Sequence, residues 1–114
     1  MITLWHNPRC SKSRQALTLL EEAGAEVTVR RYLEDAPTEE EIRAVHAALG
    51  PLPVIGMMRS GEKAFKEEGL SKDSADEALI AAMVRHPILI ERPIAIRGGK
   101  AVIGRPPEAV KGLI

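Results

Sequence analysis

The pattern of apolar and polar positions in the first third of the chain predicts a β-α-β unit. Residues 2–5 (ITLW) form a short apolar run typical of a strand, and apolar residues recur at helical spacing between Ser11 and Gly24. Residues 26–32 alternate and are rich in β-branched side chains, which indicates a second strand. Because such units are parallel and bind ligands beyond the carboxyl ends of their strands, we expect residues 6–10 to lie at a functional edge.

The middle of the chain, about residues 37–86, predicts a block of helices. Residues 38–41 (TEEE) match a capping box and precede an amphipathic segment that ends at Gly50. Residues 74–77 (SADE) match a second capping box before another amphipathic segment. Two shorter helical pieces are expected between these helices, at residues 54–59 and 61–69.

The last quarter of the chain predicts further strands and a final helix. Extended structure is expected at residues 88–90 and again from Ile94, leading through Gly98-Gly99 into a returning strand over 100–104. Pro106-Pro107 fits the start of a helix. Its apolar residues are spaced to pack inward and are Val110, Leu113 and Ile114.

This order of elements predicts an α/β fold in one domain over residues 1–114. The arrangement that fits is a thioredoxin-like four-stranded mixed sheet flanked by helices, with a helical insert between the βαβ and ββα halves. A formal net charge of zero without a block of like charge argues against general binding of nucleic acid or of an anionic membrane. No apolar run approaches the roughly 18 residues that a membrane-spanning helix needs. We therefore expect a cytoplasmic protein with no nucleic-acid or membrane partner.

Cys10 is the only cysteine and stands at the predicted junction between loop and helix. Unpaired backbone N–H groups and the positive end of the helix dipole favour a thiolate at such a position, and Arg9, Lys12 and Arg14 add positive charge. We therefore predict a lowered pKa for Cys10. A single cysteine also excludes an internal disulfide, and Ser13 stands where a C-x-x-C motif would have its second thiol.

Arginine side chains are the other candidates for chemistry. Arg59, Arg92 and Arg105 each stand beside a proline or at the end of an apolar segment, and a guanidinium fork suits a tetrahedral oxyanion. His6 could orient the cysteine loop or share charge with the thiolate, although a structural histidine is at least as common. No cysteine and histidine cluster has the spacing of a metal site, so no metal is expected.

Three segments resemble the glutaredoxin-coupled arsenate reductase family: residues 6–14 (HNPRCSKSR), 86–94 (HPILIERPI) and 104–108 (GRPPE). The resemblance spans nearly the whole chain and implies a thioredoxin-like fold with a helical insert. It implies that Cys10 attacks arsenate, that Arg59, Arg92 and Arg105 bind the oxyanion, and that His6 belongs to the site. Residues 56–60 around Arg59 match less closely than the other segments. Because Pro93 corresponds to a cis-proline placed against the cysteine loop, we predict a cis bond between Arg92 and Pro93.

The resemblance implies no bound cofactor, arsenate as substrate, glutathione as co-substrate and glutaredoxin as partner, and we expect a monomer. Two other functions remain open at this stage. A monothiol oxidoreductase acting on glutathione mixed disulfides would keep the fold but would need no arginine clamp. A non-enzymatic regulator that binds RNA polymerase shares a similar fold, but it senses oxidation through C-x-x-C, and Ser13 argues against that switch.

Overall fold

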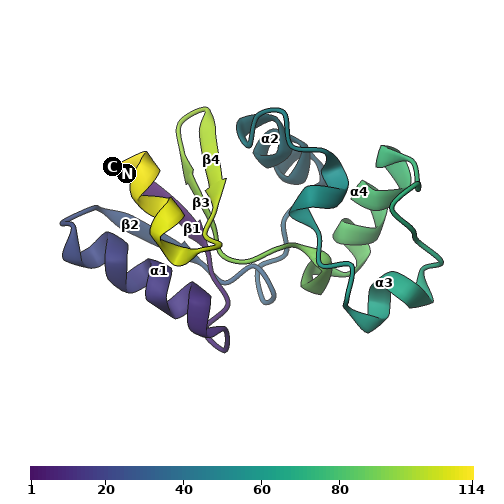
Figure 1. The fold of residues 1–114 in the computed structure, drawn as a ribbon, viewed down its shortest axis with the longest axis horizontal. Helices are drawn as coiled ribbons and strands as arrows, with labels where there is room; N and C mark the ends of the chain where they lie inside the picture. The colour runs from purple at the N-terminus through teal and green to yellow at the C-terminus, as the bar shows by residue number, and fades with distance from the viewer.

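The protein, described here by a computed structural model of residues 1–114, is built around a four-stranded sheet in the order β2-β1-β3-β4 (Figure 1). The strands are β1 (Ile2–Trp5), β2 (Val27–Arg30), β3 (Ile94–Arg97) and β4 (Lys100–Ile103). β1 pairs in parallel with β2 and antiparallel with β3, and β3 pairs antiparallel with β4. The predicted mixed sheet is therefore confirmed. β2 is shorter than predicted because the chain turns at Arg31, whose carbonyl accepts hydrogen bonds from the N–H groups of Glu34 and Asp35.

Helices occupy the segments predicted for them, with some differences in type. The α-helices are α1 (Ser11–Glu22), α2 (Glu39–Ala48), α3 (Lys63–Glu67) and α4 (Asp76–Arg85), and the 3-10 helices are η1 (Val54–Met57), η2 (Pro87–Leu89) and η3 (Pro107–Leu113). The capping box predicted for α2 forms, since Thr38 Oγ accepts from the Glu41 N–H and Glu41 Oε1 accepts from the Thr38 N–H. The predicted box at residues 74–77 is wrong. Ala75 is the N-cap of α4, and Ser74 Oγ instead accepts from the N–H of Ser71.

Two expectations near the C-terminal end are also wrong. Residues 88–90 were expected to be extended, but Pro87 begins the 3-10 turn η2, and only Ile90 makes a bridge, to Met58. Pro87 favours this turn because its fixed φ suits the first position of a helix. Ile114, expected to pack inward, is 55% exposed, because η3 ends at Leu113 and buries Pro107, Val110 and Leu113, whereas Ile114 lies beyond its end.

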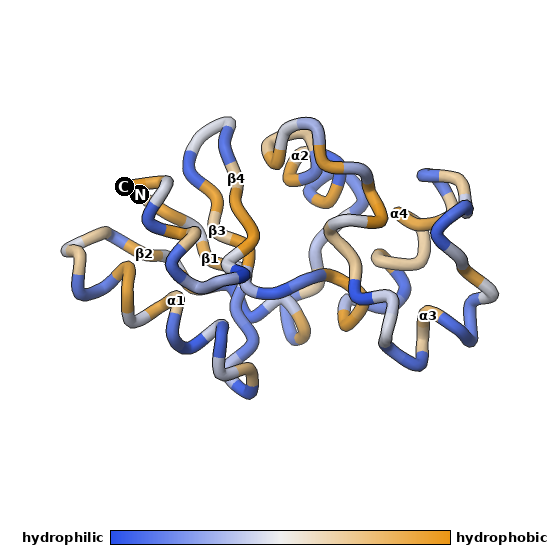
Figure 2. The backbone as a smooth tube through the Cα atoms, in the orientation of Figure 1, coloured by the Kyte–Doolittle hydropathy of each residue, from blue (hydrophilic) through white to orange (hydrophobic).

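Two cores cover the two faces of the sheet, because successive side chains of a strand point to opposite faces. Ile2 and Leu4 face α1 and η3, whereas Trp5 and Ile94 face the larger core that the helices α2 to α4 help to form. In Figure 1 the sheet with α1 and η3 makes one half of an elongated molecule, and α3 and α4 make the other. In Figure 2 β4 carries orange, apolar residues, whereas blue, hydrophilic residues gather in the middle of the molecule beside the sheet. None of the helices combines the length and the apolar character that spanning a bilayer requires.

Candidate active site

Cys10 lies between the end of β1 and the start of α1, where it is the N-cap residue with extended backbone angles (φ −97°, ψ 123°). A tight turn holds it there: its N–H donates to the Asn7 carbonyl at 3.0 Å, and the Arg9 N–H donates to Asn7 Oδ1 at 3.0 Å. Its thiol is half-buried and not bonded to another sulfur. The first N–H groups of the twelve-residue helix α1 therefore lie next to the sulfur.

The pKa of Cys10 is lowered from its ordinary value. Burial of the thiol acts against ionisation, but it is outweighed by the backbone N–H of Ser13, the guanidinium of Arg92 and the backbone N–H of Lys12, all of which stabilise the thiolate. The predicted direction is confirmed. The predicted cations are not the ones that act, because the side-chain charge comes from Arg92, far away in sequence, and not from Arg9, Lys12 or Arg14, which are exposed.

Arg92 and Arg105 reach Cys10 from the segments on either side of the β3–β4 hairpin. Arg105 Nη2 lies 3.9 Å from Cys10 Sγ, and Arg105 Nε donates to the Arg92 carbonyl at 2.9 Å. The bond between Arg92 and Pro93 is cis, as predicted, and so is the bond between Arg105 and Pro106, which was not predicted. Gly104 permits this approach, because an added Cβ would lie 2.7 Å from Pro93 Cγ.

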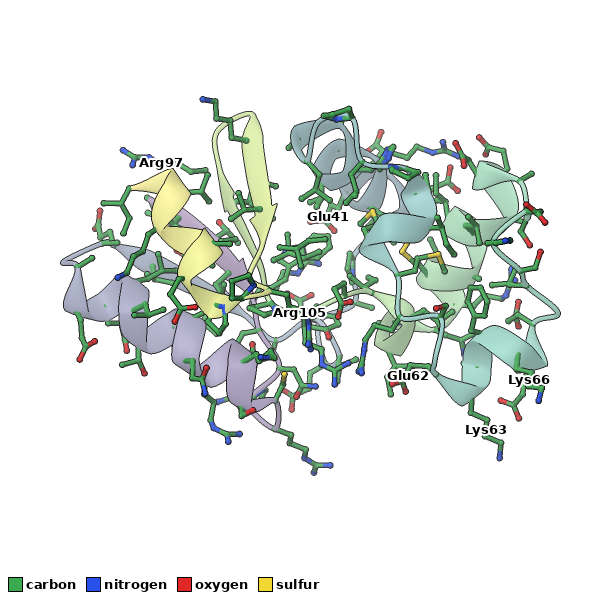
Figure 3. The ribbon with its side chains drawn as sticks, viewed as in Figure 1. Glu41, Glu62, Lys63, Lys66, Arg97 and Arg105 are labelled. Atoms are coloured by element: carbon green, nitrogen blue, oxygen red, sulfur yellow. The ribbon has the colours of Figure 1, made fainter.

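Arg59 joins the same cluster through two carboxylates. Its Nη1 lies 3.1 Å from Glu62 Oε2, and its Nε lies 3.7 Å from Glu91 Oε1. The same Glu91 oxygen lies 3.1 Å from Arg105 Nε. We call Arg59, Arg92 and Arg105 the arginine cluster. In Figure 3 Arg105 lies where the sheet and α1 meet the helical half of the molecule, and Glu62 lies at the beginning of α3.

Sequence reasoning missed Glu62 and Glu91, the two carboxylates that pair with the arginine cluster. A usable signal existed for Glu91, because it is a charged residue directly after an apolar segment and next to the Arg92-Pro93 pair. Such a residue is half-buried only where it has a partner of opposite charge. Glu62 carries no such signal, since its neighbourhood is an ordinary polar turn.

His6 supports the cysteine loop from inside and does not contribute positive charge. His6 Nδ1 lies 2.7 Å from Ser13 Oγ, and that oxygen also accepts the Asn7 N–H at 3.0 Å. Because a hydroxyl oxygen has two acceptor sites, Ser13 Oγ can serve both contacts, and the tautomer of His6 sets which group donates in the bond to Nδ1. Burial, followed by the charges of Arg31 and Arg14, lowers the pKa of His6. Of the two roles considered for His6, orienting the loop fits these contacts. Ser13 is completely buried, and sequence reasoning missed its part in them.

Tyr32 is a further polar side chain of this region that the sequence did not single out. It is buried, 1% exposed, in the turn that follows β2. Burial raises the pKa of its phenol to about 12. The positive charge of Arg92 lowers this pKa, and the negative charges of Cys10, Glu91 and Glu62 raise it further. Its neutral hydroxyl therefore lies within electrostatic reach of the thiol and the arginine cluster.

The site is a half-buried region of the surface: Cys10 is partly exposed, and the side chains of Arg59 and Arg105 are 25% and 31% exposed. A cleft of about 380 Å³ runs along the other side of the cysteine loop, and its lining does not include Cys10 or the arginine cluster. It is lined by His6, Asn7, Pro8, Arg9, Arg31, Leu33 and Glu34. Potential metal ligands do not gather anywhere in groups of three or more. The arrangement of an activated thiol beside guanidinium groups suits nucleophilic attack on an oxyanion.

Comparison with known proteins agrees with this arrangement. Residues 5–113 match the model of the ArsC family. The chain belongs to this family. An arsenate reductase of Neisseria meningitidis serogroup A is 44% identical over 99% of this chain and 97% of its own length. The uncharacterized protein YfgD of Escherichia coli K12 is 46% identical over 99% of this chain and 96% of its own length. The structure of an arsenate reductase from Vibrio cholerae superimposes with a TM-score of 0.94 at 46% identity, covering 99% of this chain and 97% of that one. The thioredoxin-like fold of this family is therefore the fold of this protein.

Proposed function

We propose that this protein is a cytoplasmic, monomeric arsenate reductase that uses glutathione and glutaredoxin and reduces arsenate to arsenite through Cys10. The observation that supports this proposal best is the juxtaposition of an activated thiol with guanidinium groups. Cys10 has a lowered pKa, and Arg105 Nη2 lies 3.9 Å from its sulfur. Relatives of similar length that carry the name arsenate reductase support the substrate.

The reaction begins with attack of the Cys10 thiolate on As(V). A sulfur–arsenic bond forms, and one arsenate oxygen leaves as water after protonation. A glutathione thiolate then attacks Cys10 Sγ, the electron pair of the sulfur–arsenic bond passes to arsenic, and arsenite departs. The product on the protein is a mixed disulfide between Cys10 and glutathione. A glutaredoxin thiolate removes the glutathione and frees Cys10, so two thiols supply the two electrons for each arsenate.

The arginine cluster holds the arsenate oxygens during this attack. Arg92 and Arg105 stand next to the sulfur, and planar guanidinium forks can each donate two hydrogen bonds to a tetrahedral oxyanion. Their charge stabilises the negative charge on the oxygens as the sulfur approaches. Arg59 lies on the far side of the Glu91 carboxylate and completes the cluster.

A steady-state assay of arsenite production tests the function directly. Wild-type protein supplied with arsenate, glutathione and glutaredoxin should turn over, whereas Cys10→Ser should be inactive under the same conditions. Absence of arsenite in the complete wild-type mixture would reject the proposal. If the protein instead cleaved glutathione mixed disulfides without reducing arsenate, the monothiol oxidoreductase function would replace it.

Alanine variants of the cluster test the role of the arginines. Arg92→Ala and Arg105→Ala should each lower kcat/KM for arsenate by about a hundredfold or more, the usual cost of one lost donor at a reacting centre. Arg92→Lys and Arg105→Lys should recover little of this loss, because an ammonium group lacks the planar fork. Lys63→Ala is a suitable control, since its side chain is 88% exposed and pairs only with Glu67. Wild-type activity in both alanine variants would leave the oxyanion site without support.

A further inference from the structure

The Glu91 side chain contacts all three members of the arginine cluster, two through their guanidinium groups and Arg92 through its backbone N–H. A single carboxylate oxygen, Oε1, lies 3.1 Å from Arg105 Nε and 3.7 Å from Arg59 Nε, and it accepts the backbone N–H of Arg92 at 3.2 Å. The Glu91 side chain is only 20% exposed. This oxygen therefore occupies the Nε edges of both the Arg59 and the Arg105 guanidinium groups, which would otherwise be open to an anion.

Backbone hydrogen bonds fix the carboxylate in this position. The Glu91 N–H donates to the Met57 carbonyl at 2.8 Å, and the Arg59 N–H donates to the Leu89 carbonyl at 2.7 Å. Between these two bonds, Met58 and Ile90 form an antiparallel bridge. The segments that carry Arg59 and Glu91 are thus paired, so their side chains leave from neighbouring positions of one small two-stranded unit.

The three arginines of the cluster are consequently not equivalent. Arg105 and Arg59 each have a carboxylate within 4 Å, whereas Arg92 Nε is buried and has no hydrogen-bond partner. The charges also balance, because the three guanidinium groups face the carboxylates of Glu62 and Glu91 and the thiolate of Cys10. An incoming anion therefore experiences far less attraction than three arginines alone would exert.

We propose that Glu91 is a built-in competitor for the oxyanion. The anion first meets Arg92 and the terminal nitrogens of Arg105 beside the sulfur, and it gains the Nε edges of Arg59 and Arg105 only by displacing the Glu91 carboxylate. Glu91 therefore sets the affinity of the site and favours ligands with enough oxygens to satisfy both guanidinium groups. Glu91 acts through the arginines and is a positioning residue. This inference rests on the proposed function in one respect, namely that oxyanions bind at the arginine cluster.

Inorganic phosphate is a suitable probe, because it is tetrahedral and a thiol cannot reduce it. The phosphate concentration that halves the rate of Cys10 alkylation by iodoacetamide reports the affinity independently of the intrinsic reactivity of each variant. Glu91→Gln keeps the size of the side chain and removes its charge. It should lower this concentration about tenfold, as expected for removing one like charge a few ångströms from a partly exposed anion.

Glu77→Gln is the matched control, because it removes the same charge from an exposed pair with Arg43 on the helical half of the molecule. Stronger phosphate binding by Glu91→Gln alone supports the proposal. An equal gain in affinity in both variants would show that only the net charge of the protein matters. Unchanged or weaker phosphate binding by Glu91→Gln would show that Glu91 only supports the arginines. Either result overturns the proposal. If Glu91→Gln does not fold, Glu91→Asp takes its place, because its shorter side chain draws the carboxylate away from the arginines. Tighter phosphate binding than in the wild type then supports the proposal, and any other result overturns it.

The same experiment separates this inference from the proposed function. Protection of wild-type Cys10 by phosphate with no gain in Glu91→Gln overturns the role of Glu91 and leaves the oxyanion site intact. No protection in any variant overturns the role of Glu91 as well, and arsenate turnover, measured separately, then shows whether the proposed function fails with it.

Discussion

At the scale of single residues, the reactivity of Cys10 depends on groups that come from opposite ends of the chain. The N–H groups of Lys12 and Ser13 are close to Cys10 in sequence, whereas Arg92 lies far away in sequence and is brought beside Cys10 by the pairing of β1 with β3. Together they outweigh the burial of the sulfur, so the folded protein holds more thiolate at neutral pH than an unfolded chain does.

The rate of Cys10 alkylation by iodoacetamide should therefore rise with pH around a midpoint below the unperturbed value of about 8.5. Arg92→Ala should move this midpoint upward, because the thiolate loses both a hydrogen bond and a positive charge. Arg9→Ala should leave it unchanged, although Arg9 is the cation next to Cys10 in sequence. A wild-type midpoint at or above that of the urea-unfolded protein would contradict a nucleophilic role for Cys10.

This contrast between Arg9 and Arg92 also shows how far sequence reasoning reaches for the site. The position of Cys10 could be predicted because a strand, a turn and a helix start are local patterns. The three arginines could be named as candidates from their positions beside prolines or at the ends of apolar segments, and the resemblance assigned them to the oxyanion. Glu91 could not be predicted as the residue that joins Arg59 to Arg105, because that contact depends on the pairing of segments 57–59 and 89–91.

At the scale of elements, β2 is joined to α2 by an ion pair of Arg30 with Glu41. Arg30 Nη1 and Nη2 both donate to the Glu41 carboxylate, and Glu41 Oε1 also accepts the Thr38 N–H at 2.9 Å. The hydrogen bond from Arg30, followed by that from the Thr38 N–H, lowers the pKa of Glu41 to about 2. The same carboxylate therefore caps the helix and anchors it to the strand.

Because the pKa of Glu41 is lower in the folded protein than in the unfolded chain, its stabilising effect is present above pH 4.5 and is lost as the pH falls toward 2. Glu41→Gln should cost about 1 kcal/mol of unfolding free energy at pH 7, a figure that allows for the 42% exposure of the side chain. Near pH 2 the variant and wild type should unfold alike. Urea titrations at both pH values measure this, and an equal difference at both would exclude an ionic origin.

The two capping-box patterns show why elements are easier to predict than their details. Both α2 and α4 begin within two residues of the positions that the patterns indicated. The TEEE pattern forms its box, but in SADE the Ser74 hydroxyl is already used by the N–H of Ser71. Hydroxyls of this kind have several backbone donors within reach, and the sequence does not determine which donor they take.

At the scale of the whole molecule, the site lies where the two halves meet. Cys10 and His6 belong to the half with the sheet and α1, whereas Arg59 and Glu62 belong to the helical half, and the segment with Glu91 and Arg92 joins them. The order of elements predicted this architecture because hydrophobic periodicity is a property of whole segments. The contacts across the junction join side chains from distant segments, so they become visible only in the folded chain.

Turnover by the whole molecule is limited by its content of thiols. Cys10 is the only cysteine, and Ser13, which stands where a resolving thiol would be, is buried and bonded to His6 and Asn7. A serine hydroxyl cannot form a disulfide. After Cys10 has bonded to arsenic or to a glutathione sulfur, release must therefore come from an external thiol.

The protein should consequently stop after one event at Cys10 unless thiols are added. With arsenate and glutathione but no glutaredoxin, mass spectrometry should find a glutathione adduct on Cys10, because the mixed disulfide then has no efficient acceptor. Adding glutaredoxin should remove the adduct and restore continuous arsenite production, and a glutaredoxin without its nucleophilic cysteine is the control that should not. Repeated turnover of arsenate with no added thiol would contradict this electron path, since the chain itself contains no second donor.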